Sequence, residues 1–133
     1  MLNVSIVLYR PDWKQVSALT QVILESQYVD RVYWVDNSPL PAEQLPLQSD
    51  RISYQHNSTN LGYGAAHNIA IRESIYDDIP YHLVINPDII LTKDALETML
   101  LFIKQHPEVG SLMPKVIYPD GRLQQRDLLL REC

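Results

Sequence analysis

Cysteine and clustered positive charge are both scarce in this sequence. Its 133 residues include one cysteine, Cys133, so a single chain can form neither a disulfide framework nor a thiolate metal site. A reducing compartment is therefore expected. The 11 Lys and Arg residues are outnumbered by 16 Asp and Glu residues and are scattered singly along the chain. Without a basic stripe that could neutralise phosphates, nucleic acid is not an expected partner.

Long hydrophobic runs, internal repeats and low-complexity tracts are absent as well. No run reaches the length of a transmembrane helix, and the apolar segment 1–9 lacks the basic flank and small-residue cleavage site of a signal peptide. Hydrophobic residues make up 46% of the chain and charged residues 20%, which supplies enough apolar material for a core. We therefore predict a single folded domain over residues 1–133.

Apolar periodicity alternates between strand-like and helix-like segments. Short runs rich in β-branched residues predict strands at residues 4–9, 31–35, 52–56 and 81–85. Apolar residues three and four apart predict helices at residues 13–26 and 65–76, and a third between a Thr92 N-cap and Pro107. Residues 109–114 and 116–118 are further strand candidates, followed by a turn at residues 119–121. This order predicts an α/β fold, with a mostly parallel sheet flanked by helices.

Polar residues follow each of the four main predicted strands. In parallel α/β sheets, ligands bind at the carboxyl ends of the strands, so these positions are where a site is expected. The four polar strand ends are Tyr9-Arg10, Asp36-Asn37-Ser38, residues 56–64 and Asn86-Pro87-Asp88.

Asp88 is the most suggestive single residue. A carboxylate that follows a buried strand is a hard oxygen ligand suited to Mg²⁺ or Mn²⁺, and such an ion can hold a diphosphate. Pro87 restrains Asn86 to extended geometry and ends the strand. The alternative is that Asn86-Pro87-Asp88 is an ordinary tight turn, whose usual composition it shares.

Asp36 and Asn37 end the second predicted strand. Together they offer hydrogen-bond acceptors and donors that suit the edge of a pyrimidine base such as uracil or thymine. The alternative is an Asx turn that caps the strand, which is the more common use of an Asp-Asn-Ser sequence.

A glycine turn leads into the second predicted helix. Asn60 and Gly62 precede the helix start, where free backbone N–H groups and the helix dipole suit an anion. The pattern is neither a dinucleotide fingerprint nor a P-loop. His67 and Asn68 are expected on the first helical turn, either reaching a phosphate or ribose or serving as exposed or capping groups.

The other three histidines, His56, His82 and His106, have no partners at metal-ligand spacing. They are expected to be structural or surface residues.

The four strand ends resemble, in order, the motifs of family 2 glycosyltransferases, particularly the rhamnosyltransferase-like branch that builds bacterial cell-surface polysaccharide. Residues 4–9 resemble the family's opening strand and residues 35–38 its acidic motif after the second strand. Residues 60–71 (NLGYGAAHNIAI) resemble its glycine and asparagine helix start, and residues 83–89 (LVINPDI) its DxD metal motif with Asn in place of the first Asp. The resemblance covers nearly the whole chain and implies a Rossmann-like GT-A nucleotide-binding half.

The resemblance also implies an activity, a cofactor and a location. The activity is inverting transfer of a sugar from a dTDP- or UDP-sugar to a saccharide or lipid-linked saccharide acceptor, in the cytoplasm or at the inner face of the membrane. Asp88 would hold Mg²⁺ or Mn²⁺. The implied nucleotide-binding residues are Tyr9, Asp36, Asn37, Asn60, Gly62, His67, Asn68 and Asn86.

Two features of the sequence depart from the family pattern. His67 stands where the family often has Arg, which implies a weaker and pH-dependent neutralisation of phosphate. The family's catalytic carboxylate and acceptor site lie in a further stretch, so we expect a truncated, donor-binding half without an identified catalytic base. An uncovered sheet edge and apolar face predict either a homodimer or poor solubility. The apolar residues Leu128, Leu129 and Leu130 are consistent with this, and a short terminal helix is the alternative.

Two other functions remain open on the sequence. A non-catalytic nucleotide-binding or assembly module fits the chain length. A sugar nucleotidyltransferase shares the fold class, but it would need a glycine-rich loop with Arg and Lys directly after the first strand. Arg10 is the only cation at that position.

Overall fold

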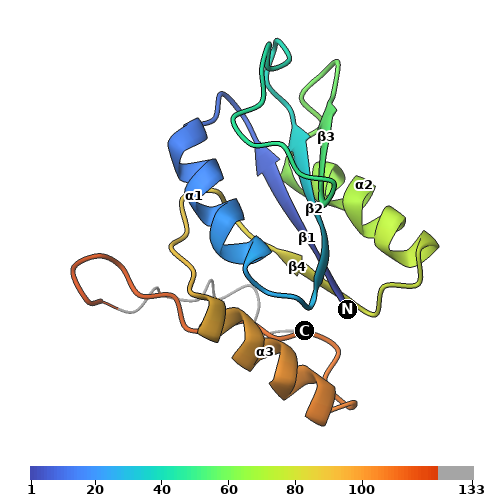
Figure 1. The fold of residues 1–133 in the computed structure, drawn as a ribbon, viewed down its shortest axis with the longest axis vertical. Helices are drawn as coiled ribbons and strands as arrows, with labels where there is room; N and C mark the ends of the chain where they lie inside the picture. The colour runs from blue at the N-terminus through green and yellow to red at the C-terminus, as the bar shows by residue number, and fades with distance from the viewer. Residues whose placement is uncertain (123–133) are drawn as a thin grey trace. The chain divides into compact units, whose positions relative to one another are not determined.

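The computed structural model describes residues 1–122 (Figure 1), and the contacts between residues divide the chain into two compact units. The first unit is Met1–Glu97 and the second begins at Thr98. Leu128, Leu129 and Leu130, on which the predicted homodimer partly rests, lie outside the described residues.

The first unit is built on a sheet of four parallel strands. The strands are β1 (Leu2–Leu8), β2 (Val29–Asp36), β3 (Ile52–His56) and β4 (Tyr81–Val84). Their order across the sheet is β3-β2-β1-β4. The chain therefore moves outward from β1 to β3 and then returns to the other side of β1. Such a reversal of direction opens a crevice at the carboxyl ends of the central strands.

The helices α1 (Trp13–Leu24) and α2 (Tyr63–Tyr76) cover opposite faces of this sheet (Figure 1). The side chains of β2 contact both helices, in alternation along the strand. Tyr33 and Val35 are buried in a cluster with the small residues Ala66 and Ala70 of α2. Trp34, between them in sequence, points the other way, and its Nε1 donates to Thr20 Oγ1 of α1 at 3.1 Å. Successive side chains of a strand face opposite sides, so α1 and α2 lie on different faces.

The central strand β1 has near-continuous burial, as expected of a strand covered on both faces. Its apolar core residues are Leu2, Val4, Ile6 and Leu8. Two polar residues, Asn3 and Ser5, are fully buried in the same strand. Each of them needs a hydrogen-bond partner inside the core, because an unpaired polar group is costly to bury.

The predicted strands and helices of the first unit are confirmed, with shifted boundaries. β2 extends beyond the predicted segment 31–35 at both ends, and α1 ends at Leu24 rather than near residue 26. α2 begins at Tyr63, two residues earlier than expected. The helix α3 (Lys93–Gln105) has its expected cap, because Ala95 N donates to Thr92 Oγ1 at 3.1 Å.

The two further strand candidates are wrong. Residues 109–114 form no strand, and within 116–118 only Ile117 makes an isolated bridge. Pro107, Pro114 and Pro119 surround and interrupt these apolar runs, and proline cannot donate to a strand ladder. The predicted turn that follows is confirmed, since Gly121 has a φ of +90° and its N–H donates to Tyr118 O at 2.8 Å.

Among residues 1–122, no helix has the length and apolar character needed to cross a membrane.

Arg51 ties the carboxyl end of α1 to the start of β3. Its guanidinium donates to the carbonyl oxygens of Leu24 at 3.0 Å, Ser26 at 2.8 Å and Val29 at 2.7 Å. The last carbonyls of a helix have no partner within the helix, and the carboxyl end carries partial negative charge. The guanidinium therefore satisfies these oxygens and fixes the connection from α1 to β2.

We expect Arg51→Met to lower the free energy of unfolding by about 2 kcal/mol, because it removes three charge-assisted hydrogen bonds but keeps the apolar stem. Urea denaturation of the two proteins measures the difference. Arg72→Met is the matched control on the exposed face of α2, expected to change stability by less than about 0.5 kcal/mol. Equal stability of both variants would contradict the role of Arg51.

Candidate functional site

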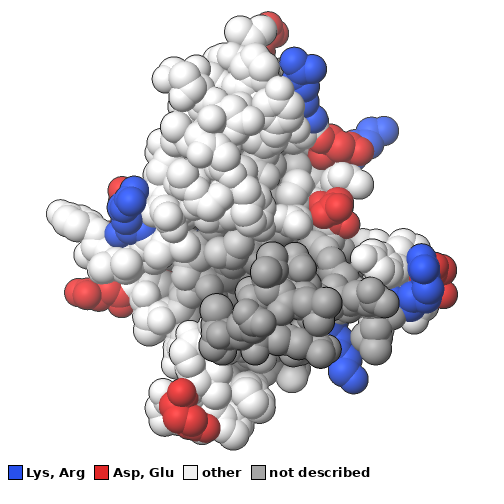
Figure 2. All heavy atoms as spheres, turned by 180° about the vertical axis from the view of Figure 1, so that it is seen from behind, with Lys and Arg blue, Asp and Glu red and all other residues white. Residues whose placement is uncertain are grey.

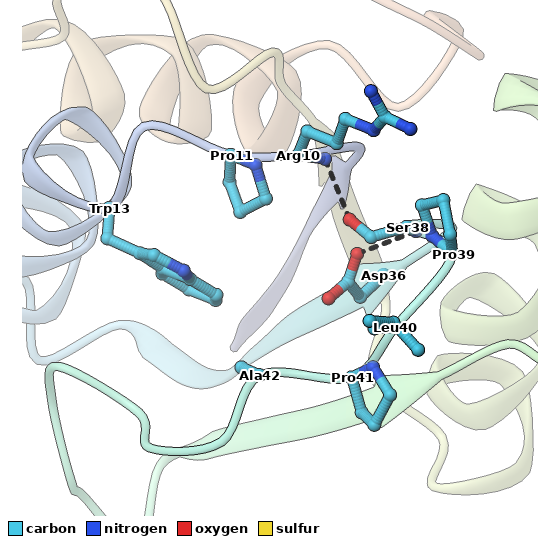
Figure 3. A pocket seen from close by; sticks show the side chains of 9 residues that line it. All are labelled: Arg10, Pro11, Trp13, Asp36, Ser38, Pro39, Leu40, Pro41 and Ala42. Atoms are coloured by element: carbon cyan, nitrogen blue, oxygen red, sulfur yellow. Dashed lines mark hydrogen bonds between the residues drawn. The ribbon is translucent and has the colours of Figure 1, made fainter.

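A pocket lies at the carboxyl ends of β1 and β2 (Figure 3). Its volume is about 470 Å³. The residues that line it are Arg10, Pro11, Trp13, Asp36, Ser38, Pro39, Leu40, Pro41 and Ala42. The loop after β1 and the loop after β2 thus form its walls, and it opens where the crevice of a parallel sheet is expected.

Asp36 forms the floor of the pocket. Its carboxylate is almost fully buried, with 1% of the residue exposed. Oδ1 accepts from Ser38 N at 2.9 Å, which is an Asx turn, and Oδ2 accepts from the Tyr54 hydroxyl at 2.6 Å. No ion pair to Asp36 is found among residues 1–122. The two interpretations of Asp36 are therefore compatible: it makes the turn, and its unneutralised carboxylate lines the pocket.

Tyr54 holds the far oxygen of this carboxylate. Burial is the largest cause that raises the pKa of Tyr54, the Ala42 N–H opposes it, and the Asp36 carboxylate adds to it. The Tyr54 hydroxyl therefore remains a proton donor at neutral pH. It also accepts from Ala42 N at 3.0 Å, so it connects the floor of the pocket to its wall.

Arg10 is held in an uncommon backbone conformation at the mouth of the pocket. Its φ of +45° lies in the left-handed region, which a residue with a side chain adopts at a cost of about 1–2 kcal/mol. The hydrogen bond from Arg10 N to Ser38 Oγ at 2.7 Å helps to hold it there (Figure 3). The exposed guanidinium lies 5.5 Å from the centre of the Tyr9 ring. Strain of this kind is often found at binding sites.

Tyr9 itself does not line the pocket. The residue is 53% exposed, and the next residue, Arg10, occupies the pocket wall. The structure therefore brings Asp36 to the pocket but not the predicted partner Tyr9.

Asn37 points away from the pocket and joins β2 to the glycine turn. Its Nδ2 donates to Gly62 O at 3.1 Å, and its Oδ1 accepts from Asn57 Nδ2 at 2.8 Å and Leu61 N at 3.4 Å. Both amide atoms are thus occupied by the protein, and the residue is 4% exposed. Asn37 positions the turn rather than presenting its amide to a ligand.

The glycine turn has the conformation that only glycine adopts without strain. Gly62 is the N-cap of α2, with φ +84° and ψ 170°, and no side chain caps the helix. Asn60 Oδ1 accepts from Gly62 N at 2.9 Å, so this amide is already used. The N–H groups of the following helical turn have no acceptor within the helix. They are the backbone donors of this turn that suit an anion.

His67 does not lie as predicted, whereas the exposure of Asn68 agrees with one of its two expected roles. Because α2 begins at Tyr63, His67 falls on the second turn, where it is 3% exposed. Its Nδ1 is 2.7 Å from Ser5 Oγ, and its Nε2 is buried without a partner. Burial lowers the pKa of His67 to about 4, so the ring is neutral at physiological pH. The expectation of a pH-dependent charge on a phosphate is not met by this buried ring, while Asn68 is exposed on the helix.

Tyr63, the first residue of α2, connects this helix to the loop that holds Asn86 and Asp88. The sequence interpretation did not include Tyr63 in the site. The Tyr63 hydroxyl donates to Asn86 Oδ1 at 2.6 Å. Burial and then the charge of Asp88 raise the pKa of Tyr63, which places the Asp88 carboxylate near this tyrosine. The only signal in the sequence is an aromatic residue with a polar tip between Gly62 and Gly64.

The described residues offer one carboxylate for a metal at this end of β4. Within residues 1–122, no three His, Cys, Asp or Glu side chains are grouped as a metal site. Mg²⁺ is often held by one or two carboxylates together with water and substrate phosphates. The exposed Asp88 fits a cation of that kind, shared with a diphosphate, and does not fit a metal held by protein alone.

Positive charge does not form a stripe on the face seen in Figure 2, where Lys and Arg lie apart from one another. This agrees with the scattered cations of the sequence.

The comparison with known families agrees with this geometry. A sequence profile of the Glycosyl transferase family 2 matches residues 18–130, and the chain therefore belongs to that family. Its fold, a four-stranded parallel sheet with three helices, is a Rossmann-like α/β fold consistent with a GT-A nucleotide-binding half. Among curated proteins, none matches this chain.

We expect Asn37→Asp to loosen the glycine turn. The change replaces the donor to Gly62 O by an oxygen and places a charge at a buried position, so the free energy of unfolding should fall by about 2 kcal/mol. Hydrogen exchange at the amide of Ala66, which donates to the same Gly62 O at 3.3 Å, should become faster. The control Asn68→Asp makes the same chemical change at an exposed position. If exchange at Ala66 is the same in both variants, Asn37 does not hold the glycine turn.

Proposed function

We propose that this chain binds a nucleoside-diphosphate sugar and acts as the donor-binding domain of a glycosyltransferase. The observation that carries the proposal is the pocket at the ends of β1 and β2, with the unneutralised Asp36 carboxylate at its floor. Membership of glycosyl transferase family 2 supports a glycosyltransferase in general. The proposed reaction is inverting transfer to a saccharide or lipid-linked saccharide, with rhamnose as a candidate sugar.

The proposed pocket ligand is a pyrimidine with an imide N–H. Uracil and thymine present a ring N–H between two carbonyl oxygens, and Asp36 offers an acceptor for that hydrogen. Trp13, Pro11 and Pro39 supply apolar walls for the ring. The exposed Arg10 supplies the one cation of the pocket lining, which suits a carbonyl oxygen or the adjoining phosphate.

The proposed diphosphate position lies between the first turn of α2 and the loop after β4, which meet where Tyr63 contacts Asn86. The first turn of α2 offers backbone N–H groups, and Asp88 would hold Mg²⁺ or Mn²⁺ together with the diphosphate oxygens. When bound, such an ion supplies positive charge to a departing diphosphate. Asn37 connects the two parts of the site, because it follows Asp36 and contacts Gly62.

Nucleotide selectivity tests the role of Asp36. In cytosine, the ring nitrogen that matches the imide N–H is an acceptor, and it would face a carboxylate. We expect UDP and dTDP to bind at least about tenfold more tightly than CDP, since a lost hydrogen bond to a charged group costs about 1.5–3 kcal/mol. Isothermal titration with the three nucleotides measures this. Equal affinities would contradict the contact, and no binding of any nucleotide at millimolar concentration favours a non-catalytic assembly module.

Metal dependence tests the role of Asp88. We expect Mg²⁺ or Mn²⁺ to strengthen the binding of UDP or dTDP to the unmodified chain, and Asp88→Asn to remove this increment while leaving the fold intact. Asp78→Asn is the matched control, because Asp78 is an exposed carboxylate whose φ of +55° suits asparagine. An unchanged metal effect in Asp88→Asn would remove Asp88 from the site.

A further inference from the structure

A chain of polar side chains, buried except for the half-buried His82, crosses the core between α2, β1 and β4. Asn3 Nδ2 donates to Ser74 Oγ at 2.9 Å, and Ser74 Oγ is 2.8 Å from His82 Nδ1. His82 Nε2 is 2.8 Å from Ser5 Oγ, which is 2.7 Å from His67 Nδ1. One hydrogen-bonded path therefore joins two points on α2 through the central strand and the edge strand.

The hydrogen count fixes the direction of these bonds. Ser74 Oγ also lies 3.2 Å from Ala70 O, which can only accept, so the single hydroxyl hydrogen of Ser74 goes there. His82 Nδ1 then carries a hydrogen and donates to Ser74, while its Nε2 accepts from the Ser5 hydroxyl. Ser5 Oγ in turn accepts from His67 Nδ1. With both imidazoles neutral, every bond in the path has one donor hydrogen and one acceptor.

An added proton has no acceptor in this arrangement. On His67 it would occupy Nε2, which is buried and has no partner within the described residues. On His82 it would occupy Nε2, which faces the hydroxyl hydrogen of Ser5, and a rotated Ser5 hydroxyl would lose its acceptor. A buried donor without an acceptor costs about 1–3 kcal/mol, and more when it is charged. Protonation of either ring therefore breaks the path.

The path is also connected to the candidate site. Tyr63 lies one turn before His67 on α2, and the two rings meet edge to face with their centres 4.4 Å apart. The Tyr63 hydroxyl reaches Asn86 beyond the end of β4. The position of His67 thus sets where Tyr63 can place its hydroxyl.

We propose that Ser5, His67, His82 and Ser74 form an acid-sensitive latch that holds α2 against β1 and β4 and positions Tyr63 at the site. The latch is closed when both imidazoles are neutral. When it takes up a proton, the first turns of α2 separate from β1, and the contact of Tyr63 with Asn86 is lost. His67 and His82 are positioning residues in this scheme, and neither contacts a ligand.

The pKa values agree with this direction. Burial lowers the pKa of His67 to about 4, and burial together with the charge of His67 lowers the pKa of His82 to about 4. The groups that face the rings are the hydroxyls of Ser5 and Ser74 and the ring of Tyr63. The ordinary pKa of 6.5 applies to the open state, so the open state binds protons first. The closed latch is therefore fully favoured above pH 6.5 and is lost progressively as the pH falls toward 4.

Hydrogen exchange and imidazole NMR between pH 4.5 and 7.5 test the latch without any nucleotide. We expect neutral Nδ1–H tautomers for both rings, and opening of the first turns of α2 that increases at least about tenfold from pH 6.5 to 5. The Tyr63 ring resonances should change over the same range. His67→Asn retains a donor at the position of Nδ1 but cannot titrate, so only His82 can still take up a proton, and the increase in opening of α2 from pH 6.5 to 5 should be clearly smaller than in the unmodified chain. His67→Leu should leave α2 exposed at every pH.

Three results would overturn the latch. They are protection of α2 that is equal in His67→Leu and the unmodified chain, a pH effect that persists in full in His67→Asn, and a Tyr63 signal that does not follow the titration. His106→Gln removes a histidine outside the path and serves as the control. UDP affinity measured in parallel should fall with the same pH profile, and absence of UDP binding would count against the proposed function while leaving the latch to be decided by exchange.

Discussion

The parallel register of the sheet is the constraint on which the rest of the site depends. Leu8 of β1 pairs with Asp36 of β2, and Asp36 pairs with His56 of β3, so three strands end at one level. β4 ends earlier, because Val84 pairs with Ser5 in the middle of β1. The loops that follow β1, β2 and β3 therefore start side by side, while the loop after β4 starts lower and meets the first turn of α2. The backbone hydrogen bonds of the sheet thus fix the levels at which these loops start.

Asp36 and Asn37, at the end of β2, point in opposite directions and make different contacts. Successive residues of a strand face opposite sides of the sheet, so one side chain reaches the pocket and the next reaches the glycine turn. The buried Asp36 carboxylate accepts hydrogen bonds from Ser38 N and the Tyr54 hydroxyl. Asn37 keeps Gly62 in place by donating to its carbonyl oxygen. The pocket and the start of α2 are thus connected through one dipeptide.

The elements of the first unit follow from the sequence because their signals are local. A run such as residues 31–35 is strand-like by composition alone, and the spacing of Val16, Leu19 and Ile23 is helical by itself. The strand ends, and with them Asp36, Asn86 and Asp88, are found by the same means. The wrong strand prediction at residues 109–114 also has a local cause. The prediction followed the apolar content of this segment, although Pro107 and Pro114 interrupt it.

What the sequence did not reveal depends on partners distant along the chain. His67 was expected near a ligand, but its partner is Ser5, 62 residues away, and only the fold brings them together. Tyr63 meets Asn86 across 23 residues in the same way. The strained backbone of Arg10 depends on Ser38, 28 residues away. A pattern of residue types carries no information on these pairs, so the sequence places the candidate residues at strand ends but does not give their contacts.

The burial of residue 67 explains why histidine can stand where arginine is frequent in sequences of this kind. A guanidinium stays charged at any physiological pH, and two serine hydroxyls and an imidazole could not compensate its charge at a position that is 3% exposed. Histidine can shed its proton and enter the core as a neutral ring. Position 67 of this chain then contributes to the packing of α2 instead of neutralising an anion. For the proposed diphosphate, the exposed Arg10 at the pocket and a cation on Asp88 are the candidate sources of positive charge instead.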